Sequence, residues 1–179
     1  LAQRGITREV AERFHLGYAP RAIGALRRHL EVLGFDIARQ LEAGVQLVRE
    51  PGDEPRPRFR GRLMFPIHDA RGNAVGFGGR SIDGSEPKYL NSSESPIFHK
   101  GQLLYNLHAA RHPIRKAERV LVVEGYFDVV RTVAAGIEEV VAPLGTALTV
   151  EQAHLMRRYS NNVFLLYDSD QAGLKATFR

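Results

Sequence analysis

The feature that most constrains this chain is a repeated alternation of apolar runs and helical segments in its last third. The runs, rich in β-branched residues, cover residues 120–123, 139–142 and 163–167. Helical spacing lies between them, from about Tyr126 to Ala135 and again after Thr149. Apolar runs that alternate with helices of about ten residues are typical of a parallel sheet with right-handed crossovers. The sequence therefore predicts an α/β fold here.

The helix after the second run has a recognisable start signal. Thr149 is followed three residues later by Gln152, which is the pattern of a capping box. In that motif the hydroxyl accepts a hydrogen bond from the amide of the third helical residue, and the amide side chain reaches back to the cap. We therefore expect a helix to open at Thr149.

The first part of the chain has a different pattern. Apolar residues recur at three- and four-residue spacing over residues 10–16, 23–33 and 37–42, which predicts short helices. Residues 49–62 follow with three Pro, two Gly and five Arg. We expect this segment to be a loop or an extended connection outside the core.

A change to strand periodicity comes next. Residues 63–69 and 74–77 flank the turn-like segment 70–73, which predicts a β-hairpin. After a polar loop, residues 103–110 have helical spacing, and we expect Pro113 to end that helix because proline restricts the residue before it. The whole pattern predicts a mixed α+β part followed by the α/β part.

Several classes of protein are excluded by what the sequence lacks. It has no Cys, which excludes a disulfide framework, a cysteine-based zinc site, an iron–sulfur cluster and thiol catalysis within these residues. The seven His do not show the paired spacing around Glu that marks a zinc protease. No apolar run approaches the roughly 18 residues that span a bilayer, and the first residues lack an apolar signal core. We expect a soluble, cytoplasmic protein without membrane association.

The charge balance favours a polyanionic partner. The chain has 25 basic and 20 acidic residues, a net charge of +5 and a pI near 9.8. Its only lysines are Lys88, Lys100, Lys116 and Lys175, so the positive charge is mostly guanidinium. Arginine holds phosphate oxygens in bidentate fashion, which suits nucleic acid. Genome base composition or thermal adaptation would also explain a protein rich in arginine. The charge alone does not separate these interpretations.

The ends of the sequence indicate a piece of a longer chain. It begins at Leu1 rather than at Met, and the residues from Asp170 to Arg179 have helical character without a stop signal. We therefore expect a fragment.

Acidic residues follow two of the predicted parallel strands. Glu124 comes directly after residues 120–123, and Asp168 and Asp170 follow the last strand two positions apart. Ligands of open parallel sheets gather at the carboxyl ends of the strands, where Mg²⁺ would relieve the repulsion between three carboxylates. Glu124 alone could cap the next helix, and Asp168 with Asp170 could open a helix through a turn. Together they favour a phosphate-handling metal site.

A glycine-rich segment lies at residues 76–81. It is not a dinucleotide-binding loop, because the last glycine is missing and the segment follows a hairpin. Two interpretations stay open: the glycines let the backbone and Arg80 approach a phosphate chain, or they mark a β-bulge. Lys88, Tyr89 and Lys100 follow, a mixture of cations and an aromatic ring that is typical of a single-strand-binding surface.

Taken in order, these segments resemble a known family. Three segments resemble the Glu and Asp-x-Asp signature of the Toprim domain, which primases, topoisomerases and some nucleases share. These segments are residues 122–130, 144–146 and 167–173. Four further segments resemble the catalytic core of bacterial DnaG-type DNA primases: residues 60–67, 76–80, 87–92 and 98–101. The resemblance implies a primase-core N-terminal subdomain with a basic groove over residues 1–117 and a Toprim domain, Rossmann-like and truncated at its C-terminal end, over residues 118–179.

The resemblance also implies roles for individual residues. The residues that would hold the catalytic Mg²⁺ or Mn²⁺ are Glu124, Asp168 and Asp170. Those that would line the basic groove for template DNA and incoming nucleotide phosphates are Arg80, Lys88, Asn91 and Lys100. Supporting residues of the Toprim motif would be Tyr126 and Asp128.

The implied activity is DNA-directed synthesis of short RNA primers. Ribonucleoside triphosphates would be joined on a single-stranded DNA template by metal-dependent nucleotidyl transfer, leaving an RNA–DNA product at the replication fork in the nucleoid. Family members carry a zinc-binding domain before this core and a helicase-binding domain after it, and neither is in this sequence. Further acidic residues and another sheet strand would follow the last motif. We therefore expect the isolated fragment to be weakly active or inactive.

Two alternative functions use the same features. A Toprim nuclease or topoisomerase would employ the same carboxylates for strand cleavage. A non-catalytic module for single-stranded nucleic acid would keep only the fold and the basic groove, and the three retained carboxylates argue against it.

Overall fold

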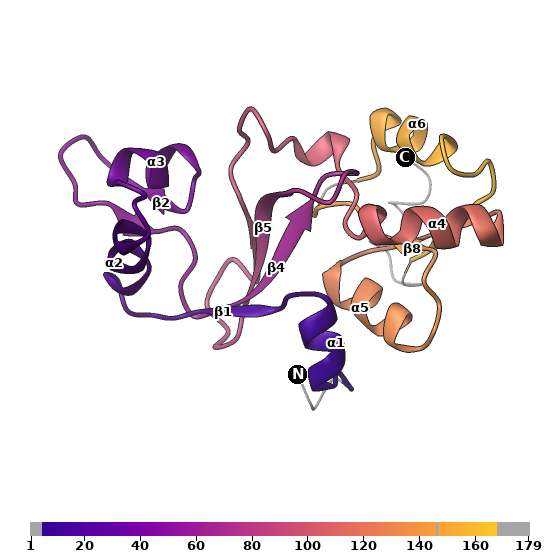
Figure 1. Ribbon diagram of the computed structural model, residues 1–179, viewed down its shortest axis with the longest axis horizontal. Helices are drawn as coiled ribbons and strands as arrows, with labels where there is room; N and C mark the ends of the chain where they lie inside the picture. Colours follow the sequence, from indigo (N-terminus) through magenta and orange to yellow (C-terminus); the bar gives the residue numbers. More distant parts are fainter. Residues whose placement is uncertain (1–4, 146, 168–179) are drawn as a thin grey trace.

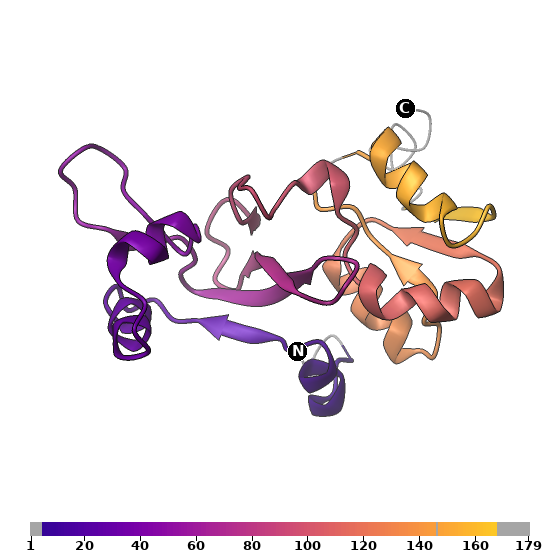
Figure 2. The same ribbon diagram turned by 45° about the horizontal axis from the view of Figure 1, so that its top comes forward.

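The computed structural model describes residues 5–145 and 147–167. Figure 1 and Figure 2 show a helical unit at one end, a parallel sheet with its helices at the other, and an antiparallel hairpin between them. In these residues no helix has the length and apolar character needed to cross a membrane. The mixed α+β part and the α/β part are both present in the predicted order, which confirms the expected fold class.

A four-stranded antiparallel sheet forms the middle of the molecule. Its strands, in the order in which they lie across the sheet, are β1 (Gly17–Ala19), β4 (Arg62–His68), β5 (Ala74–Ser81) and β6 (Tyr89–Asn91). Helix α1 (Arg8–Arg13) precedes the first strand. The predicted hairpin is confirmed as β4 and β5, and its turn is closed by Asp69, whose carboxylate accepts hydrogen bonds from the amides of Arg71 and Asn73 at 2.8 and 2.9 Å.

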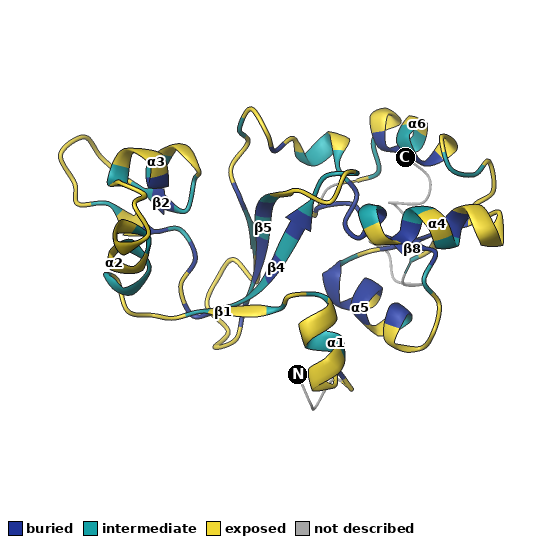
Figure 3. Cartoon of the chain, in the orientation of Figure 1, coloured by how far each residue is buried: buried dark blue, intermediate teal, exposed yellow. Residues whose placement is uncertain are grey.

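The helical unit at the first end consists of two short helices and a small hairpin. The elements are α2 (Ala25–Val32), α3 (Ile37–Glu42), β2 (Gln46–Leu47) and β3 (Arg56–Pro57). Figure 3 shows mostly exposed and half-buried residues here, and α2 has no buried residue. The prediction of short helices is confirmed for α1, α2 and α3, and the short strands β1 and β2 lie between and after them.

Most of residues 49–62 form the predicted loop or extended connection, but the segment from Pro57 to Arg62 contributes to the core, so its placement outside the core is wrong. Phe59 is buried, and the guanidinium of Arg62 lies inside, donating to the carbonyl of Pro87 at 2.8 Å. An arginine is stable there because backbone carbonyls replace its water. The local abundance of Pro, Gly and Arg did not reveal this packing.

Helix α4 (Leu107–Ala117) continues through Pro113, which contradicts the expectation that the proline ends it. It follows a single turn, η2 (Lys100–Gln102), and begins later than predicted. A proline in a helix removes one backbone hydrogen bond. Ala110 and Ile114 are buried against strands of the parallel sheet. This burial offsets the loss, because tertiary packing of the apolar face outweighs a local propensity.

The last third is the predicted parallel sheet. Its strands are β8 (Val140–Val141), β7 (Val120–Val123) and β9 (Val163–Leu166), in this order, and its helices are α5 (Tyr126–Ala134) and α6 (Val150–Arg157). Successive residues of β7 pack on opposite faces: Leu121 and Val123 join the cluster that contains α5, whereas Val120 and Val122 join the one that contains α4 and α6. Burial on both faces explains the continuous apolar run.

The predicted capping box at Thr149 is confirmed. Its hydroxyl accepts from the amide of Gln152 at 3.1 Å, and its own amide donates to the side-chain oxygen of Gln152 at the same distance. The side-chain nitrogen of Gln152 donates to the carbonyls of Lys100 and Leu103 at 3.0 and 2.7 Å. One fully buried glutamine therefore caps α6 and joins it to η2.

Candidate active site

Glu124 stands at the carboxyl edge of the parallel sheet. It follows the last residue of β7 directly and is exposed, unlike the four buried residues before it. The N-cap of α5 is Gly125, with extended backbone at φ −153° and ψ −180°. Glu124 is therefore not the capping residue of that helix, and its carboxylate lies at the edge where ligands of parallel sheets bind.

The end of β9 lies beside Glu124. Strands β7 and β9 pair in parallel with Val123 opposite Leu166, so Glu124 and Tyr167 are the next residues along each strand. Burial, and to a smaller extent the charge of Glu124, raises the pKa of Tyr167. Asp168 and Asp170 follow Tyr167 in the sequence and lie outside the described residues. Within residues 5–145 and 147–167 no cluster of three His, Asp or Glu side chains forms a metal site.

The chemistry of this edge fits a hard divalent cation. Glu124 offers exposed carboxylate oxygens, the donor type that Mg²⁺ takes together with water or phosphate oxygens. The other two predicted ligands, Asp168 and Asp170, would add oxygens of the same type.

Tyr126 is the first residue of α5 and is buried. Its ring stacks on Phe65 with 5.1 Å between centroids and meets the ring of Tyr105 edge-on at 4.8 Å. Burial raises the pKa of Tyr126, so the phenol stays protonated, and its hydroxyl donates to Oδ1 of Asn91 at 2.7 Å. Asp128 is exposed in the first turn of the same helix, where a negative charge stabilises the helix N-terminus.

Asn91 connects the antiparallel sheet to the parallel one. It ends β6, and its Nδ2 donates to the carbonyl of Leu144 at 2.8 Å. Its own carbonyl accepts two hydrogen bonds from the guanidinium of Arg58, at 3.0 and 2.7 Å. The side chain expected in the basic groove thus lies in contacts between segments of the protein.

Arg80 and Lys88 line a small cavity. It measures about 250 Å³, and Ser81 and Glu86 are among its other lining residues. The Arg80 guanidinium carbon lies 5.0 Å from the ring centroid of Phe127, so the cation rests on an aromatic face. Its Nε is buried without a hydrogen-bond partner in the described residues. The structure therefore brings two of the four predicted basic-groove residues together.

Lys100 lies on a different segment from Arg80 and Lys88. It begins η2, and its amide donates to the carboxylate of Glu94 at 3.2 Å. Its carbonyl receives the bond from Gln152 already described.

Gly78 and Gly79 serve packing, which neither interpretation of the glycine-rich segment foresaw. A Cβ on Gly78 would lie 2.6 Å from the ring of Tyr126, and one on Gly79 would lie 2.8 Å from the ring of Phe59. The register shift of the hairpin lies between the pairs Ile67–Gly76 and His68–Ala74, so an irregularity borders Gly76, whereas Gly78 and Gly79 pair in regular register and do not mark a bulge. Adjacent glycines inside a strand are a signal of close approach.

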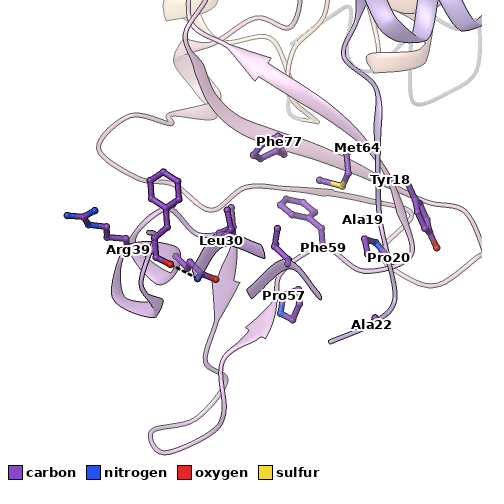
Figure 4. A pocket seen from close by; sticks show the side chains of 15 residues that line it. Tyr18, Ala19, Pro20, Ala22, Leu30, Arg39, Pro57, Phe59, Met64 and Phe77 are labelled. Atoms are coloured by element: carbon purple, nitrogen blue, oxygen red, sulfur yellow. Dashed lines mark hydrogen bonds between the residues drawn. The ribbon is translucent and has the colours of Figure 1, made fainter. Parts of the chain in front are cut away.

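A larger, apolar cavity lies away from the acidic edge. It measures about 450 Å³ between the α2–α3 unit and the antiparallel sheet, and Figure 4 shows Phe59, Met64 and Phe77 around it. Arg39 and Gln40 are polar residues in its lining. None of its described lining residues is acidic, so it does not offer the oxygen donors of the Glu124 edge.

Comparison with known proteins identifies both parts of the chain. The model of the DNA primase catalytic core, N-terminal domain, matches residues 1–111, and the Toprim domain model matches residues 118–179. The DNA primase of Geobacillus stearothermophilus is 46% identical over 178 residues, which cover 99% of this chain and 30% of the relative. That of Synechococcus elongatus is 48% identical, with 98% and 26% covered. The chain thus spans less than a third of these relatives.

Solved structures share the fold. A DNA primase domain from Pseudomonas aeruginosa superposes with a TM-score of 0.90 at 41% identity, covering 99% of this chain and 56% of that one. The RNA polymerase domain of Mycobacterium tuberculosis DnaG gives 0.90 at 32% identity, with 99% and 60% covered. A DnaG primase catalytic domain bound to ssDNA gives 0.87 at 42% identity, with 99% and 55% covered. The resemblance and the fold class predicted from the sequence are confirmed, and the chain belongs to the DnaG family of DNA primases.

Proposed function

We propose that this chain forms the part of a primase that joins ribonucleotides into short RNA primers on single-stranded DNA. The observation that carries the proposal is the exposed Glu124 carboxylate at the carboxyl edge of the parallel sheet, next to the end of β9. Helix α5 links this edge to β5 and β6, close to the Arg80–Lys88 cavity. An acidic edge beside cations suits reaction at a phosphate on a polyanionic template.

A divalent cation would be held by Glu124 together with Asp168 and Asp170. The chemistry that Mg²⁺ or Mn²⁺ supplies when bound in this kind of site is stabilisation of charge on the phosphoryl group and activation of the attacking hydroxyl. The role of Glu124 is to present its carboxylate from a rigid, buried strand. This assignment rests on residue type and position, and on the Toprim match over residues 118–179.

Arg80 and Lys88 would hold phosphates of the template or of the incoming nucleotide. The Arg80 guanidinium carbon is 5.0 Å from the Phe127 ring and 5.8 Å from the Tyr89 ring, which restricts its motion before a ligand arrives. A guanidinium held in this way loses less entropy when it pairs with phosphate. The related catalytic domain bound to ssDNA supports a single-stranded template.

The wider assignments concern a protein longer than this chain. We propose ribonucleoside triphosphates as substrates, an RNA–DNA hybrid as product, a replicative helicase as partner and the replication fork in the cytoplasm as location. A zinc-binding domain would belong to another part of the protein. A domain boundary near residue 117 agrees with the ends of the two family matches.

The test is template-dependent incorporation of labelled ribonucleotides by a full-length primase that carries this chain, with and without Mg²⁺. The proposal expects short RNA products that require the metal and are lost in Glu124→Gln. Glu50→Gln, in an exposed loop of the same chain, is the matched control and is expected to retain activity. Metal-dependent nicking without primers would indicate a Toprim nuclease or topoisomerase. DNA binding without either activity would indicate a non-catalytic module.

A further inference from the structure

Asn91 forms hydrogen bonds that join the part of the chain carrying Arg80 and Lys88 to the part carrying Glu124. It ends β6, pairs across the sheet with Gly78 of β5, and reaches both Tyr126 and Leu144 of the second part. We propose that Asn91 and Tyr126 form a positioning pair, which fixes Glu124 relative to Arg80 and Lys88 without touching template or nucleotide. The inference rests on the proposed function and assigns to Asn91 a role other than phosphate binding.

The orientation of the Asn91 amide follows from its partners. The carbonyl of Leu144 can only accept a hydrogen bond, so the nitrogen of the amide must face it, at 2.8 Å. The oxygen then faces the Tyr126 hydroxyl at 2.7 Å, and the hydroxyl donates. Both polar atoms of the side chain are therefore engaged. Only the second N–H of the amide nitrogen is left for another acceptor, such as a phosphate oxygen.

The backbone of Asn91 is held as firmly as its side chain. Its carbonyl accepts bonds from two nitrogens of Arg58, at 3.0 and 2.7 Å. Burial lowers the pKa of Arg58, and the guanidinium uses the Asn91 carbonyl in place of water. Asn91 is thus a fixed point in the antiparallel sheet rather than a mobile surface residue.

Tyr126 transmits that position to Glu124. Only Gly125, in extended conformation, separates the two residues. The Tyr126 ring is enclosed by Phe65 at 5.1 Å and Tyr105 at 4.8 Å, and its close approach to β5 requires the missing side chain of Gly78. A shift of the phenol therefore moves the start of α5 and the strand end that carries Glu124.

Leu144 supplies the second connection to the acidic edge. It follows β8, which lies beside β7 in the parallel sheet. The amide of Asn91 therefore bridges the carboxyl ends of two neighbouring strands, one directly and one through Tyr126. Catalysis requires reacting groups to be placed within fractions of an ångström, so a bond at this junction affects turnover more than affinity.

The experiment combines Tyr126→Phe, Asn91→Ala and the double variant in a full-length primase that includes this chain. For each protein, kcat, the KM for ribonucleotides, the Kd for single-stranded DNA and the Kd for Mn²⁺ are measured. Tyr126→Phe, which removes one part-buried hydrogen bond, is expected to lower kcat roughly tenfold, and Asn91→Ala, which removes two, is expected to lower it at least as much, with KM and DNA affinity within about twofold of the starting values. The Kd for Mn²⁺ is expected to rise about threefold or more in both.

Non-additivity is the central expectation. Because Asn91→Ala already removes the bond to Tyr126, the double variant should be no more impaired than Asn91→Ala alone. Tyr18→Phe removes an exposed phenol hydroxyl elsewhere in the chain and is the matched control, with no expected effect on any of the four quantities.

Three results would overturn the proposal. A raised KM or DNA Kd in Asn91→Ala, without the same change in Tyr126→Phe, would show direct contact with a ligand. Unchanged kcat and Mn²⁺ affinity in both single variants would show that the hydrogen bond has a purely structural role. Losses that multiply in the double variant would show two independent sites. If the unaltered primase makes no primers, the proposed function fails, and the pair is still decided by Mn²⁺ affinity across the same four proteins.

Discussion

The ring of Tyr126 occupies the space that a side chain on Gly78 would need. A Cβ built on Gly78 would lie 2.6 Å from two ring carbons and 2.8 Å from the hydroxyl oxygen of Tyr126. The contact joins the central antiparallel sheet to the first residue of α5. A glycine is therefore required at this position by packing, since its backbone conformation does not demand one.

Gly78→Ala is expected to destabilise the protein by about 1–3 kcal/mol, because the added methyl group must displace a ring that is packed on three sides. Gly17→Ala is the matched control, since a Cβ there would meet Met64 at an ordinary 3.9 Å. The measurement is the free energy of unfolding in urea. Equal stability of the two variants would show that the Tyr126 ring can move aside.

Gln152→Ala is expected to cost more stability than Thr149→Ala. Thr149→Ala removes the cap, worth about 1 kcal/mol, and the hydrogen bond from its hydroxyl to the carbonyl of Gly101 at 2.6 Å. Gln152→Ala removes the reciprocal capping bond and both part-buried bonds from the side-chain nitrogen to the carbonyls of Lys100 and Leu103, each worth about 1 kcal/mol. Urea unfolding of both variants measures the difference, and a larger loss in Thr149→Ala would show that the bonds of Gln152 are not the main connection between α6 and η2.

A histidine cluster is expected to make the fold acid-sensitive. The rings of His68 and His108 lie with centroids 4.4 Å apart, beside a cavity that His15 also lines. Burial, reinforced by His68, lowers the pKa of His108 from 6.5 to about 4, and burial also lowers the pKa of His68. The other charged groups that act on this pair are His15, Arg111 and Asp69.

The sign follows from the lowered folded-state pKa values. Between about pH 6.5 and pH 4 the unfolded chain binds protons at these positions and the folded protein does not, so stability falls as the pH decreases. The unfolding free energy of His108→Gln should therefore decline less over this range than that of the unaltered protein. His154→Gln, in an exposed position, is the control. An identical decline in His108→Gln would exclude His108 as a cause.

Lys88→Ala is expected to weaken binding of single-stranded DNA and to reduce its salt dependence. The slope of log K against log salt is negative, and loss of one phosphate contact reduces its magnitude by about 0.7. Lys116→Ala, at the exposed end of α4, removes the same charge away from the Arg80 cavity and should leave the slope nearly unchanged. Fluorescence anisotropy over a salt series gives both values. Equal slopes would place the DNA elsewhere on the protein.

Periodicity predicted the elements whose signals are local. The parallel strands, helix α5 and the hairpin of β4 and β5 lie close to their predicted ranges. The capping box at Thr149 was also identified, because its geometry involves residues only three positions apart. Each of these features depends on neighbours in the sequence.

The errors occur where distant residues decide the outcome. Pro113 remains inside α4 because buried contacts with the parallel sheet offset its lost hydrogen bond. Arg62 is buried because carbonyls of β5 and of the loop before β6 receive its guanidinium. Neither the contacts of α4 nor the carbonyls that accept from Arg62 can be predicted from the neighbouring residues in the sequence.

The sequence by itself determined the chemical type of the candidate site. A glutamate after one apolar strand and two aspartates after another indicate oxygen ligands at one sheet edge, because parallel strands end on the same side. Only the tertiary structure decided what Asn91 does. Its bond to Tyr126 joins residues 35 positions apart, and such a bond depends on how two separate sheets pack rather than on any local preference.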